Sequence, residues 1–413
     1  MTEHVGRTIA AGGSTASVSE VAIIEGRAGT MDDLDAITEE SLVAKGGRKW
    51  STYPGSLGAF IAEMDFGVAP VVREALTEID DRDLYGYAPA QIVADLREAT
   101  ADFCAERYGW RFPAAHVEPA SDVIAAFIAV LDLLTPAGTP IVLPTPAYMP
   151  FFDVARVTGR ELIEVPMLRT ETGWSVDLEA IDAALCPGAT LVLCNPHNPI
   201  GKVYTESELA ALADVVEANG ARVFSDEIHA PLVYEPARHV PYASLSEVTA
   251  AHTVTATAAS KAFNIPGLKC AQLILTSSED RAEWKRRGLF VSQAASNPGI
   301  LATTAAYTRG GEWLAEITAY LAGNRDLLTE LLSAELPNIP FLPPEGTYLA
   351  WLDMRGYGFD DHLTKHFTET AKVALTEGRL CGEAGAGHVR LNFALPRPLL
   401  REAVERIAAA TKG

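Results

Sequence analysis

The sequence lacks any hydrophobic run long enough to cross a membrane, and basic residues are few for a chain of 413 residues. A transmembrane helix needs about 20 consecutive apolar residues. The 33 Lys and Arg residues are outnumbered by 54 Asp and Glu residues, which leaves a formal net charge of -21. Because nucleic acids and anionic membranes attract basic surfaces, we expect neither a nucleic-acid partner nor a membrane partner.

Cysteine is scarce as well, with five residues scattered along the chain and no C-x-x-C pair. An odd, scattered set fits neither a disulfide framework nor a zinc site. The first 20 residues also lack the apolar stretch of a secretory signal. These absences predict a protein of the reducing cytoplasm that holds no metal.

Hydrophobic residues make up 48% of the chain, enough for a substantial core, and 413 residues can hold two domains. Residues 1–30 are rich in Gly, Ala, Ser and Thr without a regular period, so we expect a mobile N-terminal arm. We expect residues 31–75 to join a small domain, residues 76–310 to form a large domain, and residues 311–413 to form the small α+β domain.

Short runs of β-forming residues alternate with helical patterns in the middle of the chain. The predicted strands are at 140–146, 190–196, 221–227, 253–260 and 271–277. The predicted helices are at 69–79, 91–109, 122–138 and 205–220. In the last of these, Thr205 and Glu208 form the pattern of a capping box. Such alternation with continuous apolar strands predicts an α/β fold with a mainly parallel sheet covered on both faces.

The C-terminal part has a different pattern. A long helix is predicted at 313–336, two strands at 347–354 and 388–395, and a terminal helix at 398–413. This order of elements is typical of a separate α+β unit.

Polar side chains follow three of the predicted strands. Asn195 and Asn198 follow one strand, Asp226 and His229 follow the next, and Lys261 follows a third. Each of them alone also fits an ordinary turn, a helix cap or a solvated lysine. Because the carboxyl ends of parallel strands meet at one edge of a sheet, these groups are predicted to converge on a ligand-binding crevice.

The segments NPHNPIGKVYT, VFSDEIHAPLV, SKAFNIPGLK and VRLNFALP occur in this order. Together they resemble the pyridoxal 5'-phosphate (PLP) enzymes of aminotransferase fold type I, and within them the cystathionine β-lyases and related carbon–sulfur β-lyases. The resemblance covers roughly residues 40 to 410. It implies PLP as cofactor, and a large domain with a seven-stranded, mainly parallel sheet between helices beside a smaller α+β domain.

The resemblance also implies roles for the polar residues at the strand ends. Lys261 is similar to the lysine that links covalently to the cofactor and later acts as the catalytic base. Asp226 is similar to the catalytic carboxylate that keeps the pyridine nitrogen protonated. Asn198 resembles the amide that binds the phenolic oxygen and borders the substrate. His229 stands where many aminotransferases have a tyrosine, and Tyr148 matches the aromatic residue that stacks on the ring.

Four positions match groups that face the cofactor phosphate in relatives: the backbone of Val123 and Ile124, Ser260, and Lys269. The first two open a predicted helix, whose N–H groups favour an anion. Two positions depart from the family pattern. Asp122 replaces a Gly or Thr. Ala258 replaces a Ser or Thr that donates to the phosphate in relatives, and Ser260 is expected to take over this role. A carboxylate beside a phosphate is unfavourable unless it turns away.

Five further positions match residues that concern the substrate or the partner subunit in relatives. Arg390 resembles the arginine that binds the substrate carboxylate, although an arginine here also fits a structural salt bridge. Tyr348, Met64 and Phe66 lie in segments that border the substrate in relatives, where they are equally suited to packing. Tyr87 resembles the catalytic tyrosine that reaches into the partner's site, which implies a homodimer.

The resemblance favours β-elimination from an L-cysteine S-conjugate such as L-cystathionine, with release of a thiol, pyruvate and ammonia. An aminotransferase of a specialised amino-acid pathway is the first alternative, because both reactions begin with removal of the Cα proton. A regulatory protein that binds a transcription factor is the second alternative, and no helix-turn-helix pattern supports direct contact with DNA.

Overall fold

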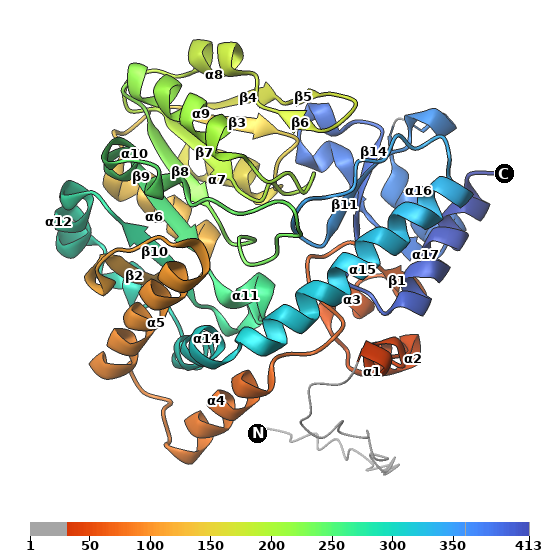
Figure 1. The fold of residues 1–413 in the computed structure, drawn as a ribbon, viewed down its shortest axis with the longest axis horizontal. Helices are drawn as coiled ribbons and strands as arrows, with labels where there is room; N and C mark the ends of the chain where they lie inside the picture. Colours follow the sequence, from red (N-terminus) through yellow and green to blue (C-terminus); the bar gives the residue numbers. More distant parts are fainter. Residues whose placement is uncertain (1–30, 360, 413) are drawn as a thin grey trace, which may run out of the picture.

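A seven-stranded sheet lies at the centre of the larger part of the molecule (Figure 1). The structure is a computed structural model that describes residues 31–359 and 361–412, so the predicted arm at 1–30 lies outside the described residues. The sheet contains, in spatial order, β2 (Val117–Ala120), β10 (Ala271–Leu275), β9 (Thr253–Thr257), β8 (Arg222–Asp226), β7 (Thr190–Cys194), β3 (Ile141–Thr145) and β4 (Leu162–Pro166). Only β10 runs antiparallel to its neighbours, so the prediction of a mainly parallel sheet is confirmed.

Helices cover both faces of this sheet, as the apolar strands predict. One face packs against α6 (Val123–Leu134), α7 (Pro150–Thr158) and α12 (Ser278–Arg287). The other face packs against α8 (Leu178–Ala184) and α9 (Glu206–Ala218). Helix α9 begins with the predicted capping box, in which Thr205 and Glu208 satisfy each other's backbone N–H groups. The fully buried strands therefore read as continuous apolar runs.

The sequence patterns missed the two strands at the edges of the sheet, β2 and β4. Their sequences, VEPA and LIEVP, each contain a proline and a glutamate. Such residues are tolerated at the edge of a sheet, where one side of the strand needs no partner. The predicted strand at 253–260 is also shorter, because residues 259–262 form one turn of helix, α11 (Ala259–Ala262).

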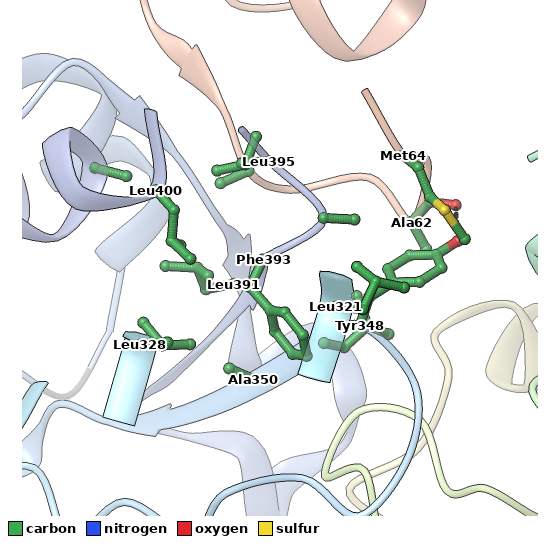
Figure 2. Close-up of a cluster of buried hydrophobic side chains, with 14 of the residues drawn as sticks. Ala62, Met64, Leu321, Leu328, Tyr348, Ala350, Leu391, Phe393, Leu395 and Leu400 are labelled. Atoms are coloured by element: carbon green, nitrogen blue, oxygen red, sulfur yellow. Dashed lines mark hydrogen bonds between the residues drawn. The ribbon is translucent and has the colours of Figure 1, made fainter. Parts of the chain in front are cut away.

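A second, three-stranded antiparallel sheet lies beside the first (Figure 1). It contains β11 (Leu349–Asp353), β14 (His388–Asn392) and β13 (Thr376–Glu377), near helices α15 (Gly311–Glu335), α16 (Leu363–Thr370) and α17 (Arg397–Ala410). Leu321 and Leu328 of α15, Leu400 of α17 and Phe393 belong to one buried cluster (Figure 2). The limits 31–75, 76–310 and 311–413 remain a proposal for how the chain divides into domains.

The N-terminal segment joins the second sheet region through a short parallel pair, β1 (Leu57–Gly58) and β12 (Val373–Ala374). The remaining elements are α1 (Met31–Asp35), α2 (Glu39–Ala44), α3 (Arg48–Ser51), α4 (Pro70–Asp81), α5 (Ala90–Tyr108), β5 (Leu168–Arg169), β6 (Trp174–Ser175), α10 (Glu247–His252), α13 (Leu289–Ser292), α14 (Asn297–Arg309) and six single 3-10 turns. In the described part of the chain, no helix has the length and apolarity required to span a bilayer.

Candidate active site

The polar residues at the strand ends gather at one edge of the large sheet. Asp226 is the last residue of β8, Asn198 lies in the turn after β7, and Lys261 lies on α11 just after β9. Strands β7, β8 and β9 are parallel neighbours, so their carboxyl ends lie side by side. The charges of Asp226 and Lys261 are close enough for each to shift the pKa of the other.

Lys261 has the properties required of an amine nucleophile. Its Nζ donates a hydrogen bond to the carbonyl oxygen of Ala62 at 3.0 Å. Burial, assisted by the nearby positive charge of Arg390, lowers the pKa of Lys261 to about 8. Glu63 and Asp226 oppose this shift because a negative charge favours the ammonium form. At a pH near 8, about half of the amine is therefore neutral and able to attack a carbonyl group.

Asp226 is a buried carboxyl group with few hydrogen-bond donors around it to stabilise its negative charge. Its Oδ1 accepts one hydrogen bond, from the backbone N–H of Ile228 at 3.2 Å. Burial raises the pKa of Asp226 to about 7, although that hydrogen bond and the charge of Lys261 act in the opposite direction. A cationic ring nitrogen beside this group would supply the missing counter-charge.

The neighbouring carboxylate, Glu227, is equally buried but fully occupied. It accepts hydrogen bonds from Ser225 Oγ at 2.9 Å and from the backbone N–H of Tyr242 at 3.1 Å. It also pairs with His239 Nε2 at 2.9 Å. Of the two acids in the SDEIH segment, Asp226 is therefore the one left available to a ligand.

Arg390 and Asn198 contact each other directly across the site. Arg390 Nη1 donates to Asn198 Oδ1 at 3.1 Å. Because a guanidinium group can only donate, this contact fixes the orientation of the amide and turns the NH₂ group of Asn198 away from Arg390. That NH₂ group is a suitable donor for a phenolic oxygen of the cofactor.

Arg390 has no acidic partner in the described residues, so the alternative of a structural salt bridge is wrong. It is buried, its Nη2 donates to the carbonyl oxygen of Phe60 at 2.9 Å and to Thr376 Oγ1 at 3.2 Å, and its Nε has no partner. Burial lowers the pKa of Arg390. A buried guanidinium without a carboxylate is a suitable receptor for the carboxylate of a substrate.

Two aromatic residues and a histidine surround this centre. Tyr348 is fully buried, donates through its OH to the carbonyl oxygen of Ala62 at 2.9 Å, and meets His229 edge-on at 5.8 Å between ring centroids. Burial and the charges of Lys261 and Arg390 hold the pKa of His229 well below its usual value, so the ring is neutral, and its Nδ1 has no partner. Tyr148 is partly buried, close enough to Arg390 and Asp226 to sense both charges.

The expected phosphate site contains an anion of its own. Val123 and Ile124 open α6 as predicted, but Asp122 does not turn away from the helix. Its Oδ1 accepts from the N–H of Ala125 at 2.8 Å, and its Oδ2 pairs with Lys269 Nζ at 3.1 Å. The side chains of Lys269 and Asp122 are 57% and 41% exposed, so both can rearrange around a phosphate.

Two of the predicted site residues have no partner in this region. Ser260 is partly buried beside Lys261, and its hydroxyl makes no hydrogen bond within the described residues. Tyr87 is 99% exposed and lies at a hollow of about 500 Å³ with Tyr85 and Asn297. A single chain therefore does not bring Tyr87 into contact with Lys261.

The residues at the site fit PLP on several independent features. Lys261 is an amine with a lowered pKa and matches the aldehyde of PLP. Within the described part of the chain, Asp226 is a buried acid without a cationic partner and matches the ring nitrogen. Asn198 has a free NH₂ group that matches the phenolic oxygen. The unpartnered Nδ1 of His229 and Nε of Arg390 are buried polar atoms that a ligand can satisfy.

The sequence patterns missed two components of the site, the carbonyl oxygen of Ala62 and the side chain of Asn392. The carbonyl oxygen of Ala62 accepts from both Lys261 and Tyr348. Asn392 donates to the carbonyl oxygens of Ile61 and Glu63, on either side of Ala62. No residue type marks a backbone acceptor, so only the tertiary structure reveals it.

Comparisons with known proteins agree with this geometry. The cystathionine beta-lyase of Corynebacterium glutamicum is 36% identical over 363 residues, covering 87% of this chain and 95% of that protein. The cystathionine beta-lyase PatB of Bacillus subtilis is 33% identical over 363 residues, covering 86% and 92%. The structure of the PLP-bound C-S lyase of Staphylococcus hominis superimposes with a TM-score of 0.83 at 27% identity, covering 89% and 96%. Residues 61–407 match a single family model, and the chain belongs to the aminotransferase class I and II family.

Proposed function

We propose that this protein is a PLP-dependent carbon–sulfur β-lyase that cleaves L-cystathionine or another L-cysteine S-conjugate. The observation that carries the proposal is the similarity, over 87% and 86% of this chain, to two relatives named cystathionine beta-lyase. The site supports it, because the residues around Lys261 fit both the cofactor and an amino-acid substrate. With L-cystathionine and water, the products are homocysteine, pyruvate and ammonia.

When bound, PLP supplies an aldehyde that links to amines and a ring that accepts the electron pair released at the substrate Cα. Asp226 would hold a proton on the ring nitrogen, and Asn198 would donate its NH₂ to the phenolic oxygen. Tyr148 would cover one face of the ring. Arg390 would bind the substrate carboxylate, which orients the Cα–H bond toward Lys261.

Lys261 performs the proton transfers of the reaction. With the substrate carboxylate held by Arg390, the Nζ of Lys261 would take the proton from the substrate Cα. Because the pKa of Lys261 is lowered to about 8, the amine can both accept and return a proton near neutral pH. Departure of a thiolate from Cβ then commits the substrate to elimination, and water completes the release of pyruvate and ammonia.

The proposal is tested by supplying L-cystathionine to the purified holoenzyme without any keto acid. We expect free thiol, pyruvate and ammonia in equal amounts, because elimination consumes only substrate and water. The thiol can be followed with a chromogenic disulfide, and pyruvate with lactate dehydrogenase. Product that forms only after addition of a keto acid would instead identify an aminotransferase, the alternative that membership of the family leaves open.

The active unit in this proposal is a homodimer in which Tyr87 completes the partner's site. Tyr87 and Phe290 are 99% and 82% exposed, and Tyr85 and Leu289 beside them are also exposed. Large apolar side chains that are exposed in a single chain are available for burial at a subunit interface. The five cysteines form no disulfide, which supports a reducing compartment, the cytoplasm, as the place of action.

We expect light scattering to give twice the 44.1 kDa mass of one chain. Tyr87→Phe should remain dimeric and lose roughly tenfold or more in kcat, because its hydroxyl would act in the neighbouring site. Tyr85→Phe is the matched control, since Tyr85 bonds Asp80 within its own chain. A monomeric enzyme with full activity would contradict this arrangement.

A further inference from the structure

Four consecutive backbone carbonyl groups, those of residues 60–63, are each held by side chains from distant parts of the chain. We call this segment the carbonyl strap. No helix or strand covers residues 59–69, so these oxygens have no regular backbone ladder. The donors are Arg390 and Thr376 for Phe60, Asn392 for Ile61, Lys261 and Tyr348 for Ala62, and Asn392 and Lys49 for Glu63.

Asn392 is the central anchor of the carbonyl strap. Its Nδ2 donates to the carbonyl oxygens of Ile61 and Glu63, both at 2.7 Å, and its Oδ1 accepts from the N–H of Ala394 at 2.7 Å. The side chain is fully buried, so its removal would take a partner from both carbonyl groups inside the protein. Asn392 lies two residues after Arg390 on β14, and alternate residues of a strand point to the same face.

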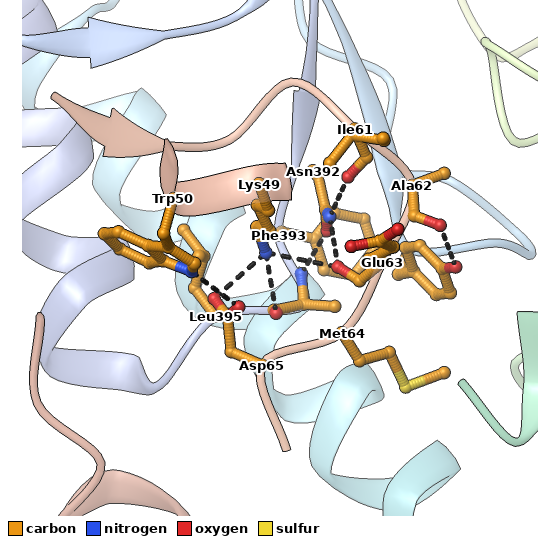
Figure 3. Close-up of polar contacts among 12 residues, drawn as sticks. Lys49, Trp50, Ile61, Ala62, Glu63, Met64, Asp65, Asn392, Phe393 and Leu395 are labelled. Atoms are coloured by element: carbon orange, nitrogen blue, oxygen red, sulfur yellow. Dashed lines mark hydrogen bonds and ion pairs between the residues drawn. The ribbon is translucent and has the colours of Figure 1, made fainter. Parts of the chain in front are cut away.

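A buried ion pair holds the far end of the carbonyl strap (Figure 3). Lys49 Nζ contacts Asp65 Oδ2 at 3.0 Å and the carbonyl oxygen of Glu63 at 3.1 Å. Trp50 Nε1 donates to the second oxygen of Asp65 at 2.9 Å. The carbonyl groups on both sides of Ala62 are therefore held, which restricts the orientation of the carbonyl of Ala62 between them.

The carbonyl of Ala62 points toward the amine of Lys261. The carbonyl oxygen of Ala62 accepts from Lys261 Nζ at 3.0 Å and from Tyr348 OH at 2.9 Å. We propose that Asn392 is a positioning residue that holds the carbonyl of Ala62 as the docking point of the Lys261 amine whenever this amine is not bound to the cofactor. The inference rests on the proposed role of Lys261. It assigns no contact with substrate to Asn392.

A loose strap has a specific chemical consequence. The carbonyl strap contacts Lys261 through the carbonyl oxygen of Ala62, and burial is the main cause of the lowered pKa of this amine. Loss of the two Asn392 contacts admits water beside Nζ, which favours the charged ammonium form, so the pKa of Lys261 should rise toward its ordinary value. A weaker contact with the carbonyl of Ala62 acts in the opposite direction, but burial is the largest cause of the shift. Less neutral amine is then available for proton abstraction at a pH near 8.

The chain offers a matched control in Asn324 of α15. Asn324 is also fully buried and also donates through Nδ2 to two carbonyl groups, those of Phe393 at 3.0 Å and Leu395 at 2.7 Å. Among the residues that the structure describes, Asn324 makes no hydrogen bond to the carbonyl strap. Asn392→Ala and Asn324→Ala therefore each delete two buried hydrogen bonds from an amide NH₂ group to backbone carbonyl groups. Only the bonds of Asn392 hold the carbonyl strap.

The test compares the two variants in the cofactor-free protein and in the holoenzyme. Reductive methylation of Lys261 at a series of pH values, read by mass spectrometry, gives the pKa of the amine without any reaction of the loaded enzyme. We expect Asn392→Ala to raise the midpoint by about one pH unit and to lower kcat at pH 8 by roughly tenfold, with a change in KM below about threefold. Asn324→Ala should lower the melting temperature and leave the midpoint unchanged.

Equal midpoints in wild type and Asn392→Ala, or equal shifts in both variants, would overturn the proposal and leave Asn392 a structural residue only. If Asn392→Ala does not fold, Asn392→Ser retains one donor and should give a smaller shift in the same direction, whereas a wild-type midpoint for Asn392→Ser would also overturn it. An enzyme that forms no thiol but shows the shifted midpoint would refute the lyase reaction and keep the role of Asn392.

Discussion

The Lys261→Ala protein is expected to bind PLP without a covalent link and to lose at least roughly 10⁴-fold in kcat. The substitution removes both the amine that captures the aldehyde and the base that moves the Cα proton, and a general base alone contributes roughly 10²- to 10⁴-fold. Two other lysines near the strand ends are already paired, Lys202 with Glu208 and Lys269 with Asp122. Borohydride reduction followed by mass spectrometry should find PLP on the wild-type peptide that contains Lys261 and on no peptide of the variant.

Lys202→Ala is the matched control for this experiment. Lys202 is buried, and its Nζ contacts Glu208 Oε1 at 2.7 Å. Its removal should cost stability and leave the visible absorbance band of the bound cofactor in place. A Lys261→Ala protein that retains this band, or wild-type protein that carries the reduced cofactor elsewhere, would remove the basis of the proposed mechanism.

Asp226→Asn is expected to lower kcat by roughly 10²- to 10³-fold, the usual effect of removing one electrostatic group that stabilises a transition state. A neutral amide cannot keep the ring nitrogen protonated, so the ring accepts electrons less readily. The amide oxygen of the variant can still accept from the N–H of Ile228, and the local fold should persist. Steady-state kinetics with L-cystathionine measure the loss, and the absorbance spectrum shows whether the cofactor remains bound.

The same substitution should stabilise the cofactor-free protein above pH 7. Burial raises the pKa of Asp226 to about 7, from an ordinary value of 3.8 in the unfolded chain. The folded state therefore binds more protons between these values, and wild-type stability falls as the pH rises through this window. Asparagine does not titrate, so the gain relative to wild type should approach about 4 kcal/mol at pH 8 and vanish below pH 4, as measured by denaturant unfolding.

Glu227→Gln provides the contrasting result, because Glu227 is as buried as Asp226 but is held by Ser225, His239 and Tyr242. It should destabilise the protein and leave the cofactor spectrum unchanged. If Glu227→Gln lost more activity than Asp226→Asn, the assignment of the two acids would have to be exchanged. A pH-independent stability difference for Asp226→Asn would contradict the raised pKa.

Much of the large sheet was predictable because each central strand is buried on both faces. Strands β3, β7, β8, β9 and β10 are short apolar runs that end before polar residues, and local composition is enough to recognise them. The edge strands β2 and β4 carry prolines and glutamates, so the same rule fails for them. The antiparallel direction of β10 depends on its connection to α11 and was not evident from its residues.

The candidate site was also predictable only in part from the sequence. Chain order and the rule for parallel strands were sufficient to place Asn198, Asp226 and Lys261 together, since side chains that follow neighbouring strands must share an edge. The resemblance of the sequence assigned this role to Asp226, but only the tertiary structure shows that Ser225, His239 and Tyr242 occupy Glu227 and leave Asp226 available. The sequence did not predict that Asp122 would cap α6 and pair with Lys269, because the partner lies 147 residues away.

By itself, the sequence determined which chemical groups this protein can bring to a reaction: one lysine, one acid and one amide at strand ends, and an arginine on a later strand. Only the tertiary structure decided how these groups are tuned. The pKa values of Lys261 and Asp226 depend on burial beneath segments far away in the chain. The carbonyl of Ala62 is aimed at Lys261 by Asn392, through hydrogen bonds that span 331 and 329 residues of the chain and that no local pattern encodes.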